Sequence, residues 1–223
     1  MIYSFFEELR REGRDFLSAL FPEKCIACRK EGSYLCKRHD ELPPAPKNEA
    51  RFTSIDHVQA TTAYYNFVAK QMVEFLKFRG FQSVGEFMTE KIVEQTPRSF
   101  WHHAVIVPIP LHWTRKFWRG FNQADILAME IAKLVPEIEI VRDLKRKKRT
   151  RQQAKLSKVR RAKNIQDVFV WESKQSIPKR VILIDDVVAS GSTLDSAGKV
   201  LKKAGVQTVD AVVFARGGGK EKN

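Results

Sequence analysis

The stretch that most constrains this chain is residues 181–193, which read VILIDDVVASGST. Four apolar residues come first, followed by two aspartates, two valines and five small residues. An unbroken apolar run of this kind is typical of a strand that is buried on both faces of a parallel sheet. The next residues have helical spacing, with apolar members at Leu194, Ala197, Val200, Leu201 and Ala204. The stretch therefore predicts a buried strand that leads through a short loop into a helix.

The loop at the end of this predicted strand has the composition of an anion site. Parallel sheets bind ligands at the carboxyl ends of their strands, and free N–H groups at a helix N-terminus favour phosphate. Gly191 lets the backbone approach such an anion, and the neighbouring serine and threonine hydroxyls add donors. Asp185 and Asp186 can accept hydrogen bonds from vicinal sugar hydroxyls or hold Mg²⁺ with a diphosphate. These residue types suit a ribose 5-phosphate that carries a diphosphate; the alternative is a buried strand that ends in a helix-capping turn.

This pattern resembles the binding motif for 5-phosphoribosyl 1-diphosphate (PRPP) in type I phosphoribosyltransferases. The resemblance implies an α/β fold with a mostly parallel sheet flanked by helices. It implies that Asp185 and Asp186 hold the ribose 2′- and 3′-hydroxyls and are the catalytic carboxylates of any transfer reaction, with Mg²⁺ accompanying PRPP. The 5′-phosphate is then expected to bind the loop residues Ala189, Ser190, Gly191, Ser192 and Thr193.

The charge of the chain is concentrated in one segment. The protein has 223 residues and a net charge of +14; residues 142–163 contain twelve Lys and Arg and one acidic residue, a net of +11 that leaves +3 for the rest. We therefore expect one basic segment with a specific role rather than a polyanion-binding field over the whole surface. No apolar stretch approaches the ~18 residues that span a bilayer, and residues 1–20 carry too many charges for a signal peptide. A cytoplasmic protein without a membrane span is expected.

All three cysteines lie in one short window together with a histidine. Cys25 and Cys28 form C-x-x-C, and Cys36 and His39 form C-x-x-H after seven intervening residues. Two such knuckles can present four ligands tetrahedrally to Zn²⁺, and a window too short for its own apolar core can fold around the metal. We predict a structural Zn²⁺ site at these four residues; the alternative is three unrelated thiols and a surface histidine.

The remaining N-terminal segments indicate two modules. Residues 2–20 have the apolar spacing of an amphipathic helix, which docks either on the protein itself or on a partner or membrane surface. Residues 42–47 contain three prolines and are expected to form a linker. We therefore expect the helix and a zinc-binding module at 1–48, a phosphoribosyltransferase-like domain at 49–217 and a disordered tail at 218–223.

Strand and helix patterns alternate along the second module. Strands are expected at residues 57–65, 104–107, 138–141, 169–171, 179–187 and 209–215, and helices at 66–78, 82–94, 123–134 and 194–204. Gly80 is expected to end the first of these helices. Alternation of this kind predicts a mostly parallel sheet with right-handed crossover connections.

Two further segments resemble one branch of that superfamily, the ComF family of competence proteins, which includes ComFC. Residues 108–128 read PIPLHWTRKFWRGFNQADILA, in which a Pro-bounded turn is followed by the signature Arg-Gly-Phe-Asn-Gln-Ala. A second segment keeps the family spacing T-x-x-Q-x-x-L-x-x-x-x-R-x-x-N at Thr150, Gln153, Leu156, Arg161 and Asn164. A zinc knuckle before a phosphoribosyltransferase-like domain is the layout of the family, although His39 stands where many members have a fourth cysteine.

The resemblance assigns the turn at residues 107–110 to diphosphate binding, through Pro108 and Ile109. Arg115 and Arg119 can neutralise that diphosphate because guanidinium groups bind phosphate in a bidentate manner. The alternative for both arginines is ordinary solvated surface charge.

The basic segment falls where the superfamily has its mobile catalytic loop. We expect it to bind the backbone of single-stranded DNA, because each neutralised phosphate releases counterions and steepens the salt dependence of binding. The residues assigned to nucleic acid are Lys145, Arg146, Lys147, Lys148, Arg149, Arg151 and Arg119. Aromatic residues interleave with basic ones at Trp113, Phe117, Trp118 and Phe121, where they either stack on bases or belong to the core. The alternative for the basic segment is an exposed charged helix without a target.

Two classes of function fit these predictions. The ComF resemblance implies a ComFC-type protein that binds PRPP and single-stranded DNA in cytoplasmic DNA uptake during natural transformation, with the competence helicase ComFA as a partner. The alternative is an active phosphoribosyltransferase that transfers ribose 5-phosphate from PRPP to an unknown acceptor, mainly by positioning and charge stabilisation. A third interpretation, a zinc-dependent interaction adaptor on an inactive transferase domain, predicts no PRPP binding.

Overall fold

The computed structural model describes residues 24–39, 41–46, 52–79, 82–147, 168–173 and 176–217, apart from the side chains of a few helical residues. The chain divides into two compact units, Met1–Leu42 and Pro43–Asn223. The predicted helix at residues 2–20, the predicted helix end at Gly80 and the predicted tail at 218–223 lie outside the described residues.

The described part of the smaller unit consists mainly of turns. Lys24 and Glu31 form an isolated antiparallel bridge, and their side chains form an ion pair with 3.0 Å between Nζ and Oε1. A backbone hydrogen bond of 2.7 Å from the N–H of Cys25 to the carbonyl of Lys30 closes the first turn. Gly32, in the turn between the two knuckles, has a φ of +116°, in the left-handed region that favours glycine.

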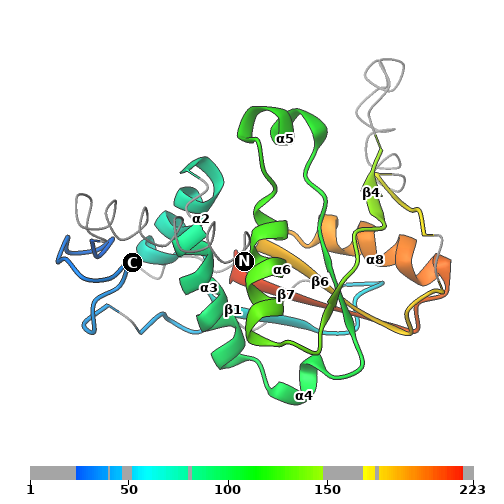
Figure 1. Cartoon of the computed structure of the whole chain (residues 1–223), viewed down its shortest axis with the longest axis horizontal. Helices are drawn as coiled ribbons and strands as arrows, with labels where there is room; N and C mark the ends of the chain where they lie inside the picture. The colour runs from blue at the N-terminus through cyan, green and yellow to red at the C-terminus, as the bar shows by residue number, and fades with distance from the viewer. Residues whose placement is uncertain are drawn as a thin grey trace, which may run out of the picture. The chain divides into compact units, whose positions relative to one another are not determined.

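The larger unit is built on a sheet of five parallel strands, which confirms the predicted fold class. The strand order is β1-β7-β6-β2-β3 (Figure 1). The bounds are Val58–Ala63 for β1, Val105–Pro108 for β2, Glu139–Ile140 for β3, Arg180–Val188 for β6 and Thr208–Arg216 for β7. Each strand lies within two residues of its predicted bounds, because apolar runs bounded by turn residues are strong strand signals.

Helices cover both faces of this sheet (Figure 1). α3 (Gln82–Gln95) and α6 (Gln123–Leu134) pack on one face, with α2 (Phe67–Arg79) against α3, and α8 (Ser192–Ala204) packs on the other. All four were predicted from their apolar spacing. α6 matches its prediction at both ends, and its first turn is capped by the side chain of Asn122.

Two short helices were not predicted. α4 (Arg98–Trp101) is a single turn whose Trp101 is buried, and α5 (Trp113–Arg119) lies in the connection between β2 and α6, away from the sheet (Figure 1). Neither helix is long enough to show a helical repeat in the sequence. Across the described ranges, no helix combines the length and the apolar character that crossing a membrane requires.

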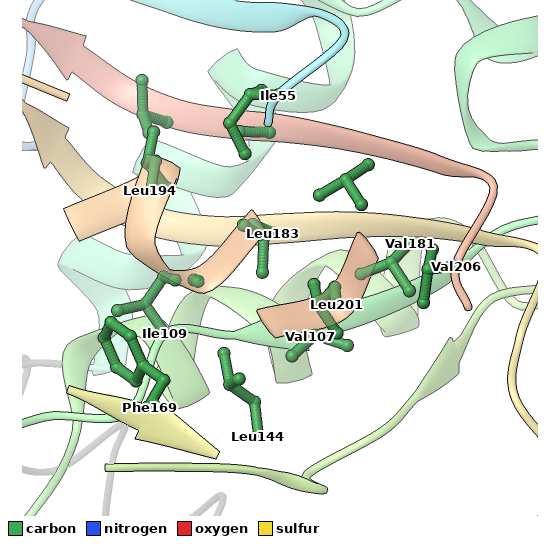
Figure 2. Packing of buried hydrophobic residues seen from close by; sticks show 14 of the residues in the cluster. Ile55, Val107, Ile109, Leu144, Phe169, Val181, Leu183, Leu194, Leu201 and Val206 are labelled. Atoms are coloured by element: carbon green, nitrogen blue, oxygen red, sulfur yellow. The ribbon is translucent and has the colours of Figure 1, made fainter. Parts of the chain in front are cut away.

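The apolar run that opens the 181–193 stretch is buried on both faces of the sheet. Val181, Ile182, Leu183 and Ile184 are all 0% exposed. Val181 and Leu183 belong to the cluster that packs with Leu194 of α8 (Figure 2). Side chains alternate along a strand, so the two isoleucines point to the opposite face. Burial on both faces explains why this run contains no polar residue.

A second, two-stranded sheet carries the start of the basic segment. β4 (Leu144–Arg146) pairs with β5 (Phe169–Trp171) in antiparallel register. β4 was not predicted because charged residues fill most of it, but Leu144 and Phe169 are each only 3% exposed and lie beside Ile109 in the core (Figure 2). The root of the basic segment is therefore anchored in the hydrophobic core, next to the turn that follows β2.

One glycine of α8 permits a close approach that positions the site. A Cβ on Gly198 would lie 2.5 Å from the carbonyl oxygen of Ser54 and 2.7 Å from Cδ1 of Ile55. The segment that precedes β1 therefore packs directly against α8, and a larger residue at this position would push the two apart.

Candidate functional site

The two aspartates lie at the carboxyl end of β6, in the middle of the sheet. β2 pairs with β6 as far as the pair Pro108–Ile184, one residue before Asp185. The N–H of Ile109 then donates to the carbonyl of Ile184 at 2.9 Å. Pro108 and Ile109, which were predicted to bind diphosphate, are thus held directly beside the strand end that carries the aspartates.

Each aspartate accepts a hydrogen bond from its own strand. Oδ1 of Asp185 accepts from the N–H of Asp186, and Oδ1 of Asp186 accepts from the N–H of Val187, each at 2.9 Å. Asp186 is 4% exposed, and its Oδ2 accepts no hydrogen bond within the part of the chain that the structure describes. The ammonium of Lys77, on α2, forms an ion pair with that oxygen at 3.2 Å. Sequence reasoning missed this lysine.

Burial and like charge raise the pKa of Asp185 well above its usual range. Desolvation is the largest cause, and the negative charge of Asp186 adds to it, whereas the positive charge of Lys77 opposes it. The carboxyl group of Asp185 therefore resists ionisation. Hydrogen-bond donors of a ligand, or a divalent cation, would favour the ionised form.

The predicted phosphate loop is shorter than expected because α8 begins at Ser192. Ser192 and Thr193 were predicted to lie in the loop but form the first turn of the helix, which leaves Ala189, Ser190 and Gly191 between strand and helix. Gly191 is the N-cap with a φ of +76°, and a glycine cap gives no side-chain signal of where the helix begins. Since Gly191 supplies no side-chain cap, this helix N-terminus can accept an anion.

The N-terminus of α8 is supported by the segment that precedes β1. A Cβ on Gly191 would lie 2.4 Å from Cε1 of Phe52, so the loop packs closely against that ring. Asp195, in the first turn of α8, accepts hydrogen bonds from the N–H groups of Thr53 and Ser54, each at 2.8 Å. Desolvation opposes these bonds, which nevertheless lower the pKa of Asp195. Such contacts between segments 142 residues apart leave no local signal in the sequence.

Asn122, in the Arg-Gly-Phe-Asn-Gln-Ala segment, ties the turn after β2 to α6. Its Nδ2 donates to the carbonyl of Ile109 and to Oδ2 of Asp125, both at 3.1 Å, and its Oδ1 accepts from the N–H of Ala124 at 3.3 Å. Asn122 is 6% exposed, so it acts as an internal brace rather than a surface residue. The spacing N-x-x-D at the start of an apolar-periodic run is a capping signal that could have identified it.

The described residues of the basic segment lie on and around β4. Lys145 and Lys147 are exposed, whereas the guanidinium of Arg146 stacks over the ring of Phe169, 5.4 Å from its centroid. Outside the described residues lie Lys148, Arg149 and Arg151, together with the second family segment at residues 150–164.

α5 contains both arginines that were predicted to bind diphosphate, Arg115 and Arg119. Nη1 of Arg119 donates to Oε1 of Gln123 at 3.3 Å, which orients this arginine along the start of α6. Arg115 lies in α5, but its side chain is outside the described part. Diphosphate binding by either arginine stays a prediction.

Two of the four aromatic residues in this region stand clear of the core. Phe117 and Trp118 on α5 are 79% and 85% exposed, with ring centroids 6.1 Å apart and ring planes at 86°. Phe121 is partly buried, and the side chain of Trp113 is not described. The core interpretation is therefore wrong for Phe117 and Trp118, while stacking on bases stays a prediction for them.

In the smaller unit, the four predicted metal ligands come together. One ligand atom from each of Cys25, Cys28, Cys36 and His39 lies within 4.8 Å of the others. The Sγ atoms of Cys28 and Cys36 are 3.7 Å apart, and Nδ1 of His39 lies 3.3 Å from Sγ of Cys36 and 3.5 Å from Sγ of Cys25. Tetrahedral bonds of about 2.0 Å to nitrogen and 2.3 Å to sulfur place ligand atoms about 3.5–3.8 Å apart. The cluster can hold a metal ion, and its geometry fits a zinc knuckle.

Two of the thiols in this cluster have a lowered pKa, which favours the thiolate form. Desolvation raises the pKa of Cys25, but backbone hydrogen bonds from Cys36, Cys28 and Ala27 outweigh it and bring that pKa to about 6. Desolvation also acts on Cys36, whose pKa is nevertheless lowered by its contact with His39. The same contact raises the pKa of His39. Thiolate is the form in which cysteine binds metal ions.

Residues 119–223 match the sequence model of the phosphoribosyl transferase domain. The match begins in the Arg-Gly-Phe-Asn-Gln-Ala segment and includes both aspartates and the loop that leads into α8. It agrees with the class of domain that the 181–193 stretch predicted.

The relatives of this chain include competence and DNA utilization proteins. Competence protein F of Haemophilus influenzae is 37% identical over 113 residues, which cover 50% of this chain and 49% of that protein. DNA utilization protein YhgH of Salmonella typhi is 32% identical over 115 residues, covering 50% and 48%. Competence protein ComFC of Bacillus subtilis is 28% identical over 152 residues, covering 63% and 56%. The predicted resemblance to ComF proteins is confirmed, and the chain spans about half the length of these curated relatives.

Proposed function

We propose that this protein is a ComFC-type competence protein that binds PRPP and single-stranded DNA in cytoplasmic DNA uptake during natural transformation. One observation carries the proposal: three features lie at the carboxyl ends of the strands of one sheet. They are Asp185 with Asp186, the turn at Pro108 and Ile109, and the N-terminus of α8. Relatives named for competence and DNA utilization support the biological context.

PRPP needs acceptors for its ribose hydroxyls and donors for its phosphates. Asp185 and Asp186 are proposed to accept the 2′- and 3′-hydroxyls, while backbone N–H groups from Ala189 to the first turn of α8 hold the 5′-phosphate. The Oγ atoms of Ser190 and Ser192 lie 3.0 Å apart, close enough to donate to one phosphate group together, and Thr193 adds a third hydroxyl.

The diphosphate is proposed to lie along the turn at Pro108 and Ile109, with Arg115 as a counter-charge. Mg²⁺ would accompany it and neutralise part of its charge. The carboxylates of Asp185 and Asp186 are hard oxygen ligands of the kind that Mg²⁺ prefers, so the residues present fit this ion.

Single-stranded DNA is proposed to bind the basic segment and α5. Lys145 is exposed on β4, whose root is anchored in the core, and Lys147 is exposed directly after it. Phe117 and Trp118 offer exposed rings on which bases can stack. The other residues proposed to contact nucleic acid are Arg146, Lys148, Arg149, Arg151 and Arg119.

The N-terminal cluster is proposed to hold structural Zn²⁺, because its four side chains would fill all four tetrahedral positions around the ion. The competence helicase ComFA is proposed as a partner from the family resemblance alone.

A second candidate function is an active phosphoribosyltransferase, which the intact aspartate pair favours. An acceptor nitrogen or oxygen would attack the anomeric carbon of PRPP and form a bond to it. The anomeric C–O bond would break, and diphosphate would leave with its electron pair. Catalysis would depend mainly on positioning and on neutralising the leaving group.

A ³¹P NMR time course of PRPP with Mg²⁺ and the full-length protein tests both candidates, with and without nucleobases and single-stranded DNA. Signals that broaden but persist are the result expected for binding without turnover. Release of diphosphate only in the presence of an acceptor would establish the second candidate. Unchanged PRPP signals at saturating protein would refute both.

DNA binding is tested by fluorescence anisotropy of a labelled single strand over a range of salt concentrations. The pair Lys145→Gln and Lys147→Gln should flatten the log–log salt slope by about 1.4, at about 0.7 for each phosphate that the variant no longer neutralises. Lys70→Gln with Lys203→Gln removes two exposed lysines outside the basic segment and serves as the control. Equal slopes for the two double variants would refute the assignment.

A further inference from the structure

Lys77 meets the aspartate pair from a separate element. It lies near the end of α2, and its side chain is 20% exposed. Its Nζ is 3.2 Å from Oδ2 of Asp186, whose side chain is 6% exposed. A basic residue of α2 therefore contacts the strand end where an anionic ligand is proposed to bind.

The buried ion pair at the opposite edge of the sheet has the features of a purely structural contact. Nε and Nη2 of Arg180 donate to Oδ2 of Asp210 at 2.9 and 2.7 Å, and Nη1 donates to the carbonyl of His102 at 3.0 Å. Asp186 and Asp210 each leave one buried oxygen without a hydrogen bond among the described residues, so the difference lies in the cation. Arg180 is fixed by three hydrogen bonds, whereas the contact of Lys77 with Asp186 is an ion pair without hydrogen-bond geometry.

The ammonium of Lys77 therefore retains the capacity to bind a ligand. An ammonium group has three N–H donors, and it is a compact charge on a flexible four-carbon stem. Such a group can turn from a carboxylate toward a neighbouring phosphate oxygen by rotation about the bonds of its own side chain. A guanidinium held like that of Arg180 would first have to break its existing hydrogen bonds.

We propose that Lys77 is a ligand-contacting residue of the PRPP site, an inference that rests on the proposed function. Before PRPP binds, the ammonium neutralises Asp186 and so allows two adjacent carboxylates to share one strand end. When the ribose hydroxyls donate to the aspartates, the ammonium donates to a phosphate oxygen of PRPP. Lys77 thereby joins the sugar-binding and phosphate-binding parts of the site.

The test is isothermal titration of the full-length, metal-loaded protein with PRPP and Mg²⁺. Lys77→Met should weaken PRPP binding at least tenfold, and Lys77→Arg should restore part of the loss because it keeps the positive charge. Lys202→Met is the matched control, because it removes another lysine that pairs with an aspartate, Asp56, at 2.7 Å but lies at the other end of α8 from the loop. This control should bind PRPP within twofold of wild type.

A second measurement does not depend on the folding of Lys77→Met. In the wild-type protein labelled with ¹³C-lysine, the Lys77 side-chain signal is identified by its absence from the spectrum of Lys77→Arg. Saturation with PRPP should shift this signal, whereas the Lys202 signal should stay in place. A Lys77 signal that does not move at saturation would overturn the inference.

The outcomes separate this inference from the proposed function. If wild-type protein binds no PRPP, the proposed function fails and the role of Lys77 fails with it. If wild type binds PRPP and folded Lys77→Met binds it within twofold, only the role of Lys77 is refuted. If Lys77→Met and Lys202→Met lose affinity equally, the effect of Lys77 is a general loss of stability rather than a direct interaction with the ligand, and the inference is again refuted.

Discussion

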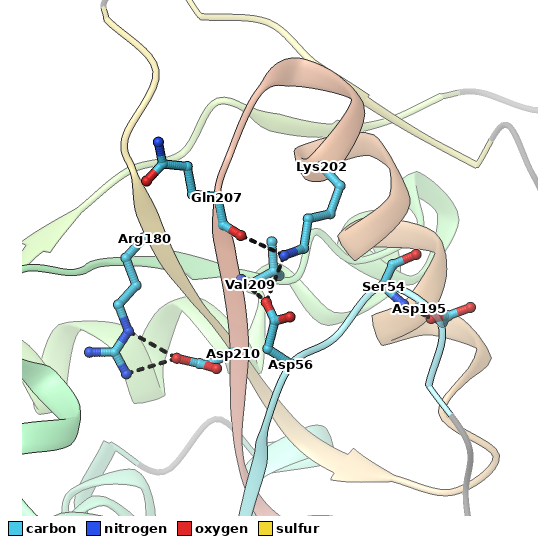
Figure 3. A network of polar contacts seen from close by, with 8 residues as sticks. All are labelled: Ser54, Asp56, Arg180, Asp195, Lys202, Gln207, Val209 and Asp210. Carbon is cyan, nitrogen blue, oxygen red and sulfur yellow. Dashed lines mark hydrogen bonds and ion pairs between the residues drawn. The ribbon is translucent and has the colours of Figure 1, made fainter.

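The strands of the five-stranded sheet begin at its amino edge and end at its carboxyl edge, and pairs of lysine and aspartate have different roles at these two edges. At the amino edge, Lys202 donates to Oδ2 of Asp56 at 2.7 Å and to the carbonyl of Gln207 at 2.6 Å, and the N–H of Val209 donates to the same oxygen of Asp56 at 2.8 Å (Figure 3). At the carboxyl edge, the Oδ2 of Asp186 meets one ammonium at 3.2 Å and accepts no hydrogen bond from the described residues. Charged groups brace the first edge, whereas at the second edge one buried carboxylate oxygen has an ion pair but no hydrogen bond from the described residues.

The pKa shifts at the two edges have opposite signs. Desolvation acts on Asp56, but its contact with Lys202 prevails and lowers its pKa. Desolvation and the charge of Asp186 raise the pKa of Asp185. Ionisation of Asp56 therefore stabilises the fold, whereas ionisation of Asp185 destabilises it. The fold therefore tolerates an unfavourable charge on Asp185 at the carboxyl edge, where a ligand is proposed to compensate it.

Arg180→Met should cause the largest loss of stability. The substitution leaves Asp210, whose side chain is 1% exposed, without its cation, so the free energy of unfolding should fall by about 3–5 kcal/mol in urea titrations. Arg98→Met removes an exposed pair with Glu137 at 3.9 Å and should change stability by no more than about 0.5 kcal/mol. Equal stability of the two variants would show that the buried pair of Arg180 and Asp210 does not brace the amino edge.

The double substitution Asp185→Asn and Asp186→Asn should have the next largest effect, and on binding instead of stability. Loss of both ribose acceptors should weaken PRPP binding at least about 100-fold, or about 2.8 kcal/mol, in titration calorimetry. The melting temperature should change little, because relief of the repulsion between the two aspartates offsets the loss of the ion pair between Asp186 and Lys77. Glu94→Gln, at an exposed carboxylate on α3, is the control. Unaltered PRPP affinity in the double variant would show that the carboxyl edge is not a PRPP site.

Asp185→Asn alone should stabilise the protein at neutral pH. The folded-state pKa of Asp185 is raised, so its contribution to stability is fully present below the ordinary aspartate pKa and is lost as pH rises through the folded value. Asparagine does not ionise, so we expect a gain of about 1 kcal/mol at pH 7 that disappears in acid. Chemical denaturation of both proteins from pH 3 to pH 8 measures the difference. A variant less stable than wild type at pH 7 would reverse the assigned sign.

Asp56→Asn should give the smallest effect and the opposite pH dependence. The folded-state pKa of Asp56 is lowered, so its stabilisation is present above the ordinary aspartate pKa and is lost as pH falls through the folded value. The carboxylate is 40% exposed, so solvent screening should keep the loss at neutral pH below about 1 kcal/mol. The same denaturation series detects it, and a loss that persists in acid would point to packing instead of charge.

Predictions from the sequence were accurate where the signal is local. The run before Asp185 showed a strand buried on both faces, and the four metal-cluster residues fall in one short window. The bounds of α6 followed from its apolar spacing. The start of α8 was wrong by two residues, because a glycine cap carries no side-chain signal.

Predictions fell short where distant segments meet. α5 and β4 are short and charged, so no periodic pattern indicates them. The contact of Phe52 with Gly191 and the ion pair of Lys77 with Asp186 join segments far apart in the chain. The exposure of Phe117 and Trp118 also depends on where the connection between β2 and α6 lies.

The sequence by itself determined that this protein has a buried parallel strand ending in two aspartates before a helix, a cysteine and histidine cluster and one basic segment. These features follow from spacing and composition over short windows, where the chemistry of neighbouring residues is sufficient. Only the tertiary structure decided which cation meets Asp186, which carboxylates brace the fold, and which aromatic rings face solvent. Burial and ion pairing depend on segments that fold together from distant parts of the chain, and no local pattern records which segments will meet.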